Sequence, residues 1–275
     1  MIGIIDFGSQ YTQLIARRIR ELSVFSKIYP YFVKKDELKD CYALILSGSP
    51  KSVLEENHPD MPTELWDINI PILGICYGMQ LIAKHYGGEV LAGKAEFGKA
   101  NLQILKKTSK LFAGVPDNVT VWMSHGDYVS KVPKDFELTA ETSSVKIAAI
   151  ESAELKRYGI QFHPEVHHSV CGMKVLENFL FSIANAKKDW NLKSFVDEEV
   201  ANLKKEIGNE KVICGISGGV DSTVSALLVH KAIGNNLKCI FVDHGLLRTF
   251  EKEEVTEALK NLGLNLTILD RKDLF

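Results

Sequence analysis

The sequence predicts an α/β protein of two successive units, the first with a mixed, mainly parallel sheet and the second with a partial, doubly wound parallel sheet. In the first part of the chain, short apolar runs alternate with segments of helical periodicity, a pattern typical of parallel strands joined by helices. A polar stretch at 185–191 interrupts this alternation, and a second one begins near residue 212. The length of 275 residues fits one large domain or two smaller ones, and the interruption favours two.

In the first unit, strands are predicted at the short apolar runs, and helices where apolar residues recur every three or four positions. The segment at 10–22, for example, places Leu14, Ile15 and Ile19 on one helical face. On this basis we expect strands at 2–7, 42–46, 70–76, 119–123, 146–150 and 158–162, and helices at 10–22, 77–85 and 171–186.

The second unit is expected to contain strands at 212–216, 237–242 and 264–269 and helices at 220–233 and 251–262. Strand 212–216 is apolar on both faces, which is typical of a central strand. A doubly wound sheet would place a further strand on its far side, and we find no candidate for one. We therefore expect the chain to be the N-terminal part of a longer protein, which strand neighbours on both sides of 212–216 would contradict. The expected divisions are a first domain at 1–187, a linker and leading helix at 188–210, and an incomplete domain at 211–275.

Composition and charge exclude several classes of protein. Hydrophobic residues make up 45% of the chain and charged residues 25%, which is ordinary for a folded globular protein. With 33 Lys and Arg against 35 Asp and Glu, the net charge is −2, so we expect neither nucleic acid nor a membrane as the main partner. The five cysteines are scattered without a C-x-x-C pair, which favours a reducing, cytoplasmic location.

Cys76 lies in the motif G-I-C-Y-G, between a predicted strand and a predicted helix. This is the thiol counterpart of the G-x-S-x-G nucleophile elbow, in which flanking glycines permit a sharp turn that exposes the nucleophile. The N–H groups at the start of the helix would favour a thiolate and a developing oxyanion. The alternative is an inert core cysteine at the end of a strand.

A base for Cys76 is available in F-H-P-E. Because Pro164 restricts the preceding residue to extended backbone, His163 and Glu165 project to the same side. The carboxylate can then fix the ring tautomer and leave the other ring nitrogen free to accept the thiol proton. The alternative is a histidine paired with a surface glutamate. A metal site using His163 and His167 or His168 is disfavoured, because Pro164 opposes a helix there and no third ligand is evident.

Together, the two motifs resemble the class I, triad-type glutamine amidotransferases. The resemblance rests on G-I-C-Y-G-M-Q at 74–80 and F-H-P-E-V at 162–166, and it spans residues 1–185. It implies that Cys76 attacks the side-chain amide of glutamine, forms a γ-glutamyl thioester and releases ammonia. His163 would act as acid and base, and Glu165 would orient it.

The same resemblance implies further site residues. Backbone N–H groups of Ser49 and Tyr77 would form the oxyanion hole, and the residues expected to bind glutamine are Gly48, Gln80, Ser124, Gly126 and Asp127. The family usually has Gly-Gly-Pro in the oxyanion loop, where this chain has Gly48-Ser49-Pro50. If Ser49 must adopt φ > 0, serine is disfavoured by about 1 kcal/mol or more, and the loop would then become active only with substrate or a partner domain.

A second motif, S-G-G-V-D-S at 217–222, joins a predicted strand to a predicted helix. Its glycines allow the backbone to approach phosphate oxygens, and its hydroxyls and the helix N-terminus add donors. Asp221 suits a Mg²⁺ ion that accompanies a phosphate, or the positive end of the helix. No Gly-Lys-Ser/Thr follows, so the motif is not a Walker A loop. The alternative is a glycine-rich turn before a capped helix.

This motif resembles the pyrophosphate loop of the N-type ATP pyrophosphatases, an adenine nucleotide alpha hydrolase-like family. The resemblance implies ATP-binding by Ser217, Gly218, Gly219, Val220, Asp221, Ser222 and Thr223, with Val242 as a backbone contact to the base. Residues 241–248 resemble the segment that follows the second strand in members that aminate XMP, with His244 where asparagine is common.

A triad-type domain before such a loop implies a glutamine-dependent ligase that uses glutamine, ATP with Mg²⁺, and XMP to form GMP, without a tightly bound cofactor. The family's XMP-binding and dimerisation region would follow residue 275, so we expect a homodimer only for the full-length protein. We also expect the 275 residues to bind ATP weakly and to form no GMP unaided. Two alternatives remain: another glutamine-dependent ligase, such as one that aminates deamido-NAD, and a non-catalytic nucleotide-binding protein with a vestigial triad.

Overall fold

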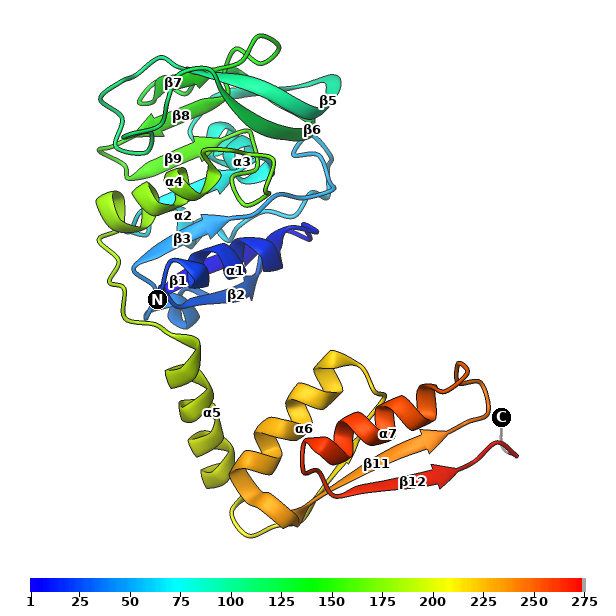
Figure 1. Cartoon of the computed structure of the whole chain (residues 1–275). Helices are drawn as coiled ribbons and strands as arrows, with labels where there is room; N and C mark the ends of the chain where they lie inside the picture. Colours follow the sequence, from blue (N-terminus) through cyan, green and yellow to red (C-terminus); the bar gives the residue numbers. More distant parts are fainter. Residues whose placement is uncertain (274–275) are drawn as a thin grey trace. The chain divides into compact units, whose positions relative to one another are not determined.

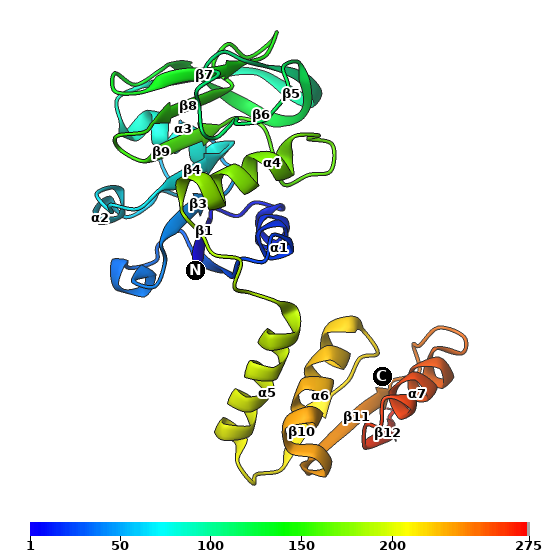
Figure 2. The same cartoon turned by 60° about the vertical axis from the view of Figure 1, so that its left-hand side comes forward.

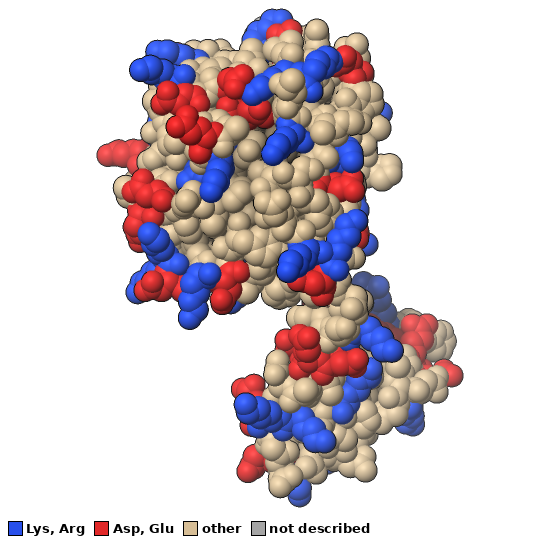
Figure 3. Space-filling model, turned by 90° about the vertical axis from the view of Figure 1, so that its left-hand side faces the viewer, with Lys and Arg blue, Asp and Glu red and all other residues tan. Residues whose placement is uncertain are grey.

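The computed structural model describes residues 1–273, with the backbone alone at residues 94 and 95. The chain forms two compact units, Met1–Trp190 and Asn191–Phe275 (Figure 1). Each unit has its own sheet and its own apolar core, so the α/β class expected from the alternating pattern is confirmed. On the face of the chain drawn in Figure 3, positive and negative side chains are interspersed.

The first unit is built on a nine-stranded sheet with the order β2-β1-β3-β4-β9-β8-β7-β5-β6. The strands from β2 to β9 in this order run parallel, and those from β9 to β6 are antiparallel. The strands are β1 (Ile2–Asp6), β2 (Ser26–Pro30), β3 (Ala43–Leu46), β4 (Ile72–Ile75), β5 (Glu89–Ile104), β6 (Val119–Lys131), β7 (Glu137–Glu141), β8 (Ala149–Ser152) and β9 (Arg157–Ile160). The helical segments are α1 (Thr12–Glu21), η1 (Lys35–Leu38), α2 (Thr63–Trp66), α3 (Tyr77–His85), α4 (Gly172–Glu177) and η2 (Asn178–Ile183).

Helices cover both faces of the parallel half of this sheet, as Figure 2 shows. Because side chains alternate along a strand, Ile4 of β1 packs in one core with α1 and α4, whereas Ile5 packs in the other with α2 and α3. Parallel strands buried on both faces require continuous apolar runs, and β3 is accordingly fully buried along its length.

Several predicted boundaries differ from the structure for local reasons. The strand expected at 146–150 begins only at Ala149, because Thr142 donates its backbone N–H to Val145 and closes a turn there. The strand expected at 119–123 continues to Lys131, where it pairs with β5. The helix expected at 171–186 consists of α4 and a π-helical segment that ends at Ile183.

The second unit has a three-stranded parallel sheet with the order β10-β11-β12. Its elements are α5 (Leu192–Ile207), β10 (Val212–Gly215), α6 (Val220–Ile233), η3 (Gly234–Asn236), β11 (Leu237–Asp243), α7 (Glu251–Asn261) and β12 (Leu266–Asp270). Among the described residues β10 pairs with β11 alone, so this strand, which the sequence indicates as central, lies at the edge of the sheet with Ile213 70% exposed. Successive parallel strands bring the loops after β10 and β11 to the same edge of the sheet.

Candidate active site

Cys76 occupies a strained turn between β4 and α3. Its φ of 54° lies in the left-handed region, which costs a residue with a side chain of order 1 kcal/mol or more. Close packing holds the turn in place: a Cβ on Gly74 would lie 2.4 Å from the Gly78 carbonyl oxygen, and one on Gly78 would lie 2.5 Å from the Leu46 oxygen. Both flanking positions therefore require glycine, as the elbow motif predicts.

Strand register brings the triad residues from distant parts of the chain together. Ile75 at the end of β4 pairs with Ile160 at the end of β9, and the Cys76 N–H donates to the Ile160 carbonyl at 2.8 Å. The segment after β9 leads directly to His163. Because the two parallel strands end at the same edge of the sheet, the thiol and the imidazole lie next to each other there, and both line one pocket.

His163 and Glu165 form a buried pair. The Nδ1 atom of His163 lies 2.7 Å from Oε1 of Glu165, and the two residues are only 3% and 1% exposed. Ser169 Oγ donates to the His163 carbonyl at 2.5 Å, and Arg18 Nε donates to the Glu165 carbonyl at 2.9 Å. These bonds fix the backbone on both sides of Pro164 and leave Nε2 of the ring for the thiol.

The protonation of His163 is set by three opposing effects. Burial lowers its pKa, but hydrogen bonds to the Cys76 thiol and to the Glu165 carboxylate outweigh burial and raise the pKa well above 6.5. The imidazole therefore holds a proton readily. This is the behaviour needed of a base that must accept a thiol proton.

The oxyanion loop carries no strain at Ser49. Ser49 is not among the described residues with positive φ, so the condition under which serine would be disfavoured there does not arise in this conformation. The Ser49 hydroxyl accepts the Lys51 N–H at 3.1 Å, and the buried Ser47 hydroxyl donates to the Gly48 carbonyl at 3.0 Å. Tyr77, whose N–H is the other expected donor, begins α3 directly after Cys76.

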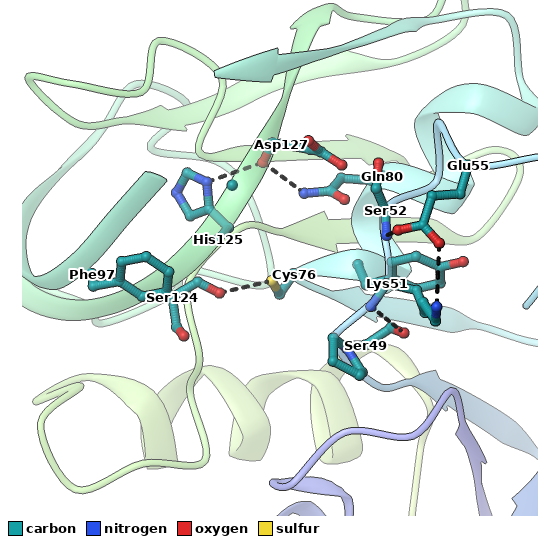
Figure 4. Close-up of a pocket in the computed structure, with 13 residues that line it drawn as sticks. Ser49, Lys51, Ser52, Glu55, Cys76, Gln80, Phe97, Ser124, His125 and Asp127 are labelled. Atoms are coloured by element: carbon teal, nitrogen blue, oxygen red, sulfur yellow. Dashed lines mark hydrogen bonds and ion pairs between the residues drawn. The ribbon is translucent and has the colours of Figure 1, made fainter. Parts of the chain in front are cut away.

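A pocket of about 300 Å³ opens beside the Cys76 sulfur (Figure 4). Besides Cys76, six of the residues expected at the oxyanion hole or the glutamine site line it directly, namely Ser49, Tyr77, Gln80, Ser124, Gly126 and Asp127. Gly48 lines an adjoining pocket of about 250 Å³ that also contains Cys76 and His163. The size and the polar lining suit a small polar ligand such as an amino acid.

Polar contacts order the wall of this pocket. Gln80 Nε2 donates to the Asp127 carbonyl at 2.8 Å, and the Cys76 thiol donates to the Ser124 carbonyl at 3.6 Å. Phe97, 72% exposed, also lines the pocket and lies beside Ser124 in Figure 4. The pocket thus offers a route to the sulfur although Cys76 itself is only 5% exposed.

The second predicted site is an exposed loop between β10 and α6. Gly218 has φ 83°, and a Cβ on it would lie 2.6 Å from Val255 Cγ2. The Ser217 hydroxyl accepts the Gly219 N–H at 3.3 Å and lies 3.2 Å from the Ser222 hydroxyl. The Thr223 hydroxyl donates to the Gly219 carbonyl at 2.8 Å. The loop therefore combines glycine backbone, several hydroxyls and a helix N-terminus, which are the groups that bind phosphate.

Val220, Asp221 and Val242 complete the predicted nucleotide residues. Val220 and Asp221 begin α6 and are exposed, and Val242 lies one residue before the end of β11, 38% exposed. Among residues 1–273, no three His, Cys, Asp or Glu side chains are grouped to hold a metal ion. A lone carboxylate such as Asp221 fits Mg²⁺ only when phosphate oxygens and water supply the other ligands.

Comparison with known proteins decides the family. Residues 3–183 match the family model for class-I glutamine amidotransferases. The chain belongs to this family. Residues 191–275 match the family model for NAD synthase, so the boundary between the two matches lies close to the boundary between the two compact units at Trp190.

The relatives of this amidotransferase include curated ligases. It is 50% identical to the GMP synthase [glutamine-hydrolyzing] of Chlorobaculum tepidum, over 99% of this chain and 54% of that protein. It is 47% identical to that of Clostridium botulinum, over 100% of this chain and 54% of that protein. The chain thus spans about half the length of the curated relatives it matches.

Solved structures support the fold. A Thermoplasma acidophilum protein, described as a candidate GMP synthase subunit, is 34% identical with a TM-score of 0.62, covering 67% of this chain and 93% of its own. A glutamine amidotransferase of Thermotoga maritima, 20% identical with a TM-score of 0.50 over 95% of this chain and 93% of its own, shares the fold. Within the described part of the amidotransferase, no helix is long and apolar enough to cross a membrane.

Gln161 is a buried residue of the amidotransferase site that the sequence did not indicate, and buried His125 lies within the run S-H-G-D at 124–127 that the resemblance matches to the glutamine site. Gln161 Nε2 lies 3.6 Å from the Cys76 sulfur. His125 Nδ1 lies 3.0 Å from the Asp127 carbonyl, and burial lowers the His125 pKa despite the nearby Glu96 carboxylate. Gln161 lies two residues before His163, and His125 lies in the run S-H-G-D. Neither position by itself indicates that the side chain lies near Cys76.

Proposed function

We propose that the first unit hydrolyses glutamine at Cys76, His163 and Glu165, and that the second unit binds ATP, as parts of a GMP synthase that aminates XMP. The observation that carries the proposal is the buried His163–Glu165 pair beside a strained, pocket-lining cysteine. Identity of about 50% to curated GMP synthases over nearly the whole chain supports the choice of product. In this proposal the amidotransferase domain is 1–187, the linker and leading helix are 188–210, and the nucleotide domain is 211–275.

The proposed chemistry begins when the Cys76 sulfur forms a bond to the amide carbon of glutamine and His163 takes the thiol proton. Backbone N–H groups of Ser49 and Tyr77 stabilise the oxyanion. When the C–N bond breaks, His163 returns the proton to the leaving nitrogen and ammonia departs. Water then attacks the thioester, with His163 again as base, and glutamate is released. Glu165 remains ionised and holds the ring in one orientation.

Glutamine is proposed to lie in the pocket beside Cys76. Gly48, Gln80, Ser124, Gly126 and Asp127 would hold its α-amino and α-carboxylate groups. The Asp127 carboxylate is the natural partner for the ammonium group, since a charged pair in a partly enclosed pocket is stronger than one in water. Glutamine would thus be held at one end by charge and at the other by the oxyanion hole.

In the second unit, residues 217–223 are proposed to bind the phosphates of ATP, with Asp221 as a partner of the accompanying Mg²⁺ and the Val242 backbone against the base. ATP would activate an oxygen of XMP by adenylation, and ammonia would displace AMP. No resident cofactor is required by this scheme. Hydrogen exchange tests it: ATP with Mg²⁺ should slow exchange of the amides at 217–223, and Asp221→Asn should weaken the part of this protection that depends on Mg²⁺.

One alternative has an observation of its own. The match of residues 191–275 to the NAD synthase model favours a ligase that aminates deamido-NAD. Measuring ATP binding by the intact ligase in the presence of each compound distinguishes the two substrates. XMP should alter the ATP affinity, whereas deamido-NAD should not. A non-catalytic role is opposed by the buried, hydrogen-bonded triad, since an unused buried charge pair is costly to maintain.

Glutamate release from glutamine by the 275-residue chain tests the proposed hydrolysis. Cys76→Ala should abolish release, whereas Cys214→Ser, a change at a partly exposed cysteine of the second unit, should leave it unaltered. Release that persists in Cys76→Ala would exclude the proposed nucleophile.

A further inference from the structure

Gln161 lies beside the nucleophile because of strand register. Ile75 pairs with Ile160, so the next residues along the two strands, Cys76 and Gln161, are neighbours. The segment after β9 bends at Gln161 and Phe162, and its course brings both the Gln161 amide and the His163 imidazole to the sulfur. The Gln161 side chain is fully buried, with 0% exposure.

The hydrogen-bond network fixes which end of the Gln161 amide faces the sulfur. The Asp127 carbonyl can only accept, so the atom of Gln80 that lies 2.8 Å from it is the amide nitrogen. That nitrogen also lies 3.4 Å from the Gln161 oxygen, which must accept its second proton. The nitrogen of Gln161 therefore faces the Cys76 sulfur, at 3.6 Å.

The groups around the sulfur differ in whether they can hydrogen-bond to the thiol or to the thiolate. The Ser124 carbonyl accepts the thiol proton at 3.6 Å but can give nothing to a thiolate. The Gln161 N–H can donate to the thiolate, and hydrogen bonds to a charged acceptor are about twice as strong as neutral ones. The Gln161 amide thus favours the charged, nucleophilic form of Cys76.

We infer that Gln161 is a further catalytic residue of the glutamine site, whose carboxamide N–H stabilises the thiolate of Cys76. For its part in turnover this inference rests on the proposed function. The amide also links the nucleophile to the wall of the pocket, through Gln80 to the Asp127 carbonyl. The sulfur is therefore held in line with the place where the substrate is proposed to lie.

Gln161→Glu tests the inference in the 275-residue chain. The variant keeps the size of the side chain and the acceptor for Gln80 but replaces the donor that faces the sulfur with a carboxylate oxygen. The measurement is the rate of Cys76 alkylation by iodoacetamide against pH, read from the Cys76 peptide by mass spectrometry. We expect the pH of half-maximal rate to rise by about one unit or more and the rate at pH 7 to fall about tenfold or more. Glutamine kcat should fall about 10- to 100-fold with little change in KM.

Asn178→Asp is the matched control. Asn178 is a buried amide of the same unit whose Nδ2 donates to the Leu111 and Ala113 carbonyls, at 3.0 and 2.8 Å. The same exchange there should lower the melting temperature and leave the alkylation profile of Cys76 unaltered. A merely structural role for Gln161 would make the two variants behave alike.

An unaltered alkylation profile in folded Gln161→Glu would overturn the inference. If that variant does not fold, two further measurements test the inference. One is the alkylation profile of Gln161→Met, which lacks the donor. The other is the side-chain amide NMR signals of Gln161 in the unaltered protein. Those signals should shift when Cys76 is alkylated, and constant signals would contradict the contact. Alkylation of Cys76 requires no glutamine hydrolysis. If the chain does not hydrolyse glutamine, the proposed function is contradicted, but the alkylation profile still tests the contact between Gln161 and Cys76.

Discussion

At the scale of single residues, Cys76 differs from the other cysteines in its surroundings. Burial raises the pKa of Cys171 to about 11, and it raises the pKa values of Cys41 and Cys239 as well. These three thiols are packed in apolar cores. Cys76 instead has His163, an amide donor and a helix N-terminus close by, which is the environment of a reactive thiol.

Glu165→Gln tests the role assigned to the buried carboxylate. Without the charge, the pKa of His163 should fall, and glutamate release should fall about 10²- to 10⁴-fold. Because the folded pKa of His163 lies above its unfolded value of 6.5, the resulting stabilisation is complete below pH 6.5 and is lost as pH rises through the folded pKa. The difference in unfolding free energy between the two proteins should therefore narrow above pH 6.5. Denaturant titrations at several pH values measure this, and a constant difference would contradict the account.

At the scale of elements, the active site depends on how closely α3 approaches β3 and β4. Gly78 permits that approach, because its Cα faces the Leu46 carbonyl without a side chain between them. A four-residue strand and a nine-residue helix suffice to form the turn. The stability of the elbow therefore depends on packing more than on helix propensity.

Gly78→Ala should destabilise the first unit by about 1–3 kcal/mol, the usual cost of overpacking, because the new methyl would lie 2.5 Å from the Leu46 oxygen. Gly126→Ala is the control, since Gly126 lies in the same unit and a Cβ there meets nothing within 4 Å. Its effect should stay within about 0.5 kcal/mol. Urea unfolding followed by tryptophan fluorescence reports on the first unit, and equal midpoints for Gly78→Ala and the unaltered chain would contradict the packing argument.

In the second unit, Asp243 joins three elements. It ends β11 and pairs with Lys252 of α7 at 3.0 Å and with Lys272, after β12, at 3.2 Å. Hydrogen bonding to Lys252 is the main cause that lowers the pKa of Asp243 to about 2, with further contributions from the Gly245 N–H and Lys272. The carboxylate thus ties the end of β11 to α7 and to the segment after β12.

Asp243→Asn should therefore destabilise the second unit at neutral pH. Since the folded pKa lies below the usual value of 3.8, the stabilisation is present above pH 3.8 and is lost as pH falls toward 2. The variant and the unaltered chain should differ in hydrogen exchange of β11 peptides at pH 7 and converge as the pH falls through this window. Identical exchange at pH 7 would show that the ion pairs contribute nothing.

At the scale of the whole molecule, the sequence predicts the parallel half of the first sheet, apart from its edge strand β2, and the whole of the second. These strands are short, continuous apolar runs, as for β3, and the helices after Cys76 and Gly219 begin and end at the residues expected. Both chemical motifs lie at strand-to-helix turns, where the local sequence motif indicates the turn.

Strands β2, β5 and β7 and part of the site could not be predicted in this way, whereas β6 and β8 were expected with different bounds. β5 is half exposed, contains Lys and Gly, and changes register where it pairs with β6. Its sequence therefore shows neither a continuous apolar run nor a regular alternation of apolar and polar residues. β2 is a five-residue edge strand with alternating burial that ends in Pro30. His125 reaches the pocket and Gln161 reaches the Cys76 sulfur through strand pairing between distant segments, which one sequence without its register does not reveal.

Covalent labelling by a diazoketone analogue of glutamine, mapped by mass spectrometry, tests the central claim most directly. The account predicts an adduct on Cys76 and on no other cysteine, slowed by excess glutamine, slowed further in His163→Ala and absent in Cys76→Ser. An adduct on Cys214 or another thiol instead, or labelling of Cys76 that glutamine does not slow, would contradict the claim that a triad in a glutamine-binding pocket is the working centre of this chain.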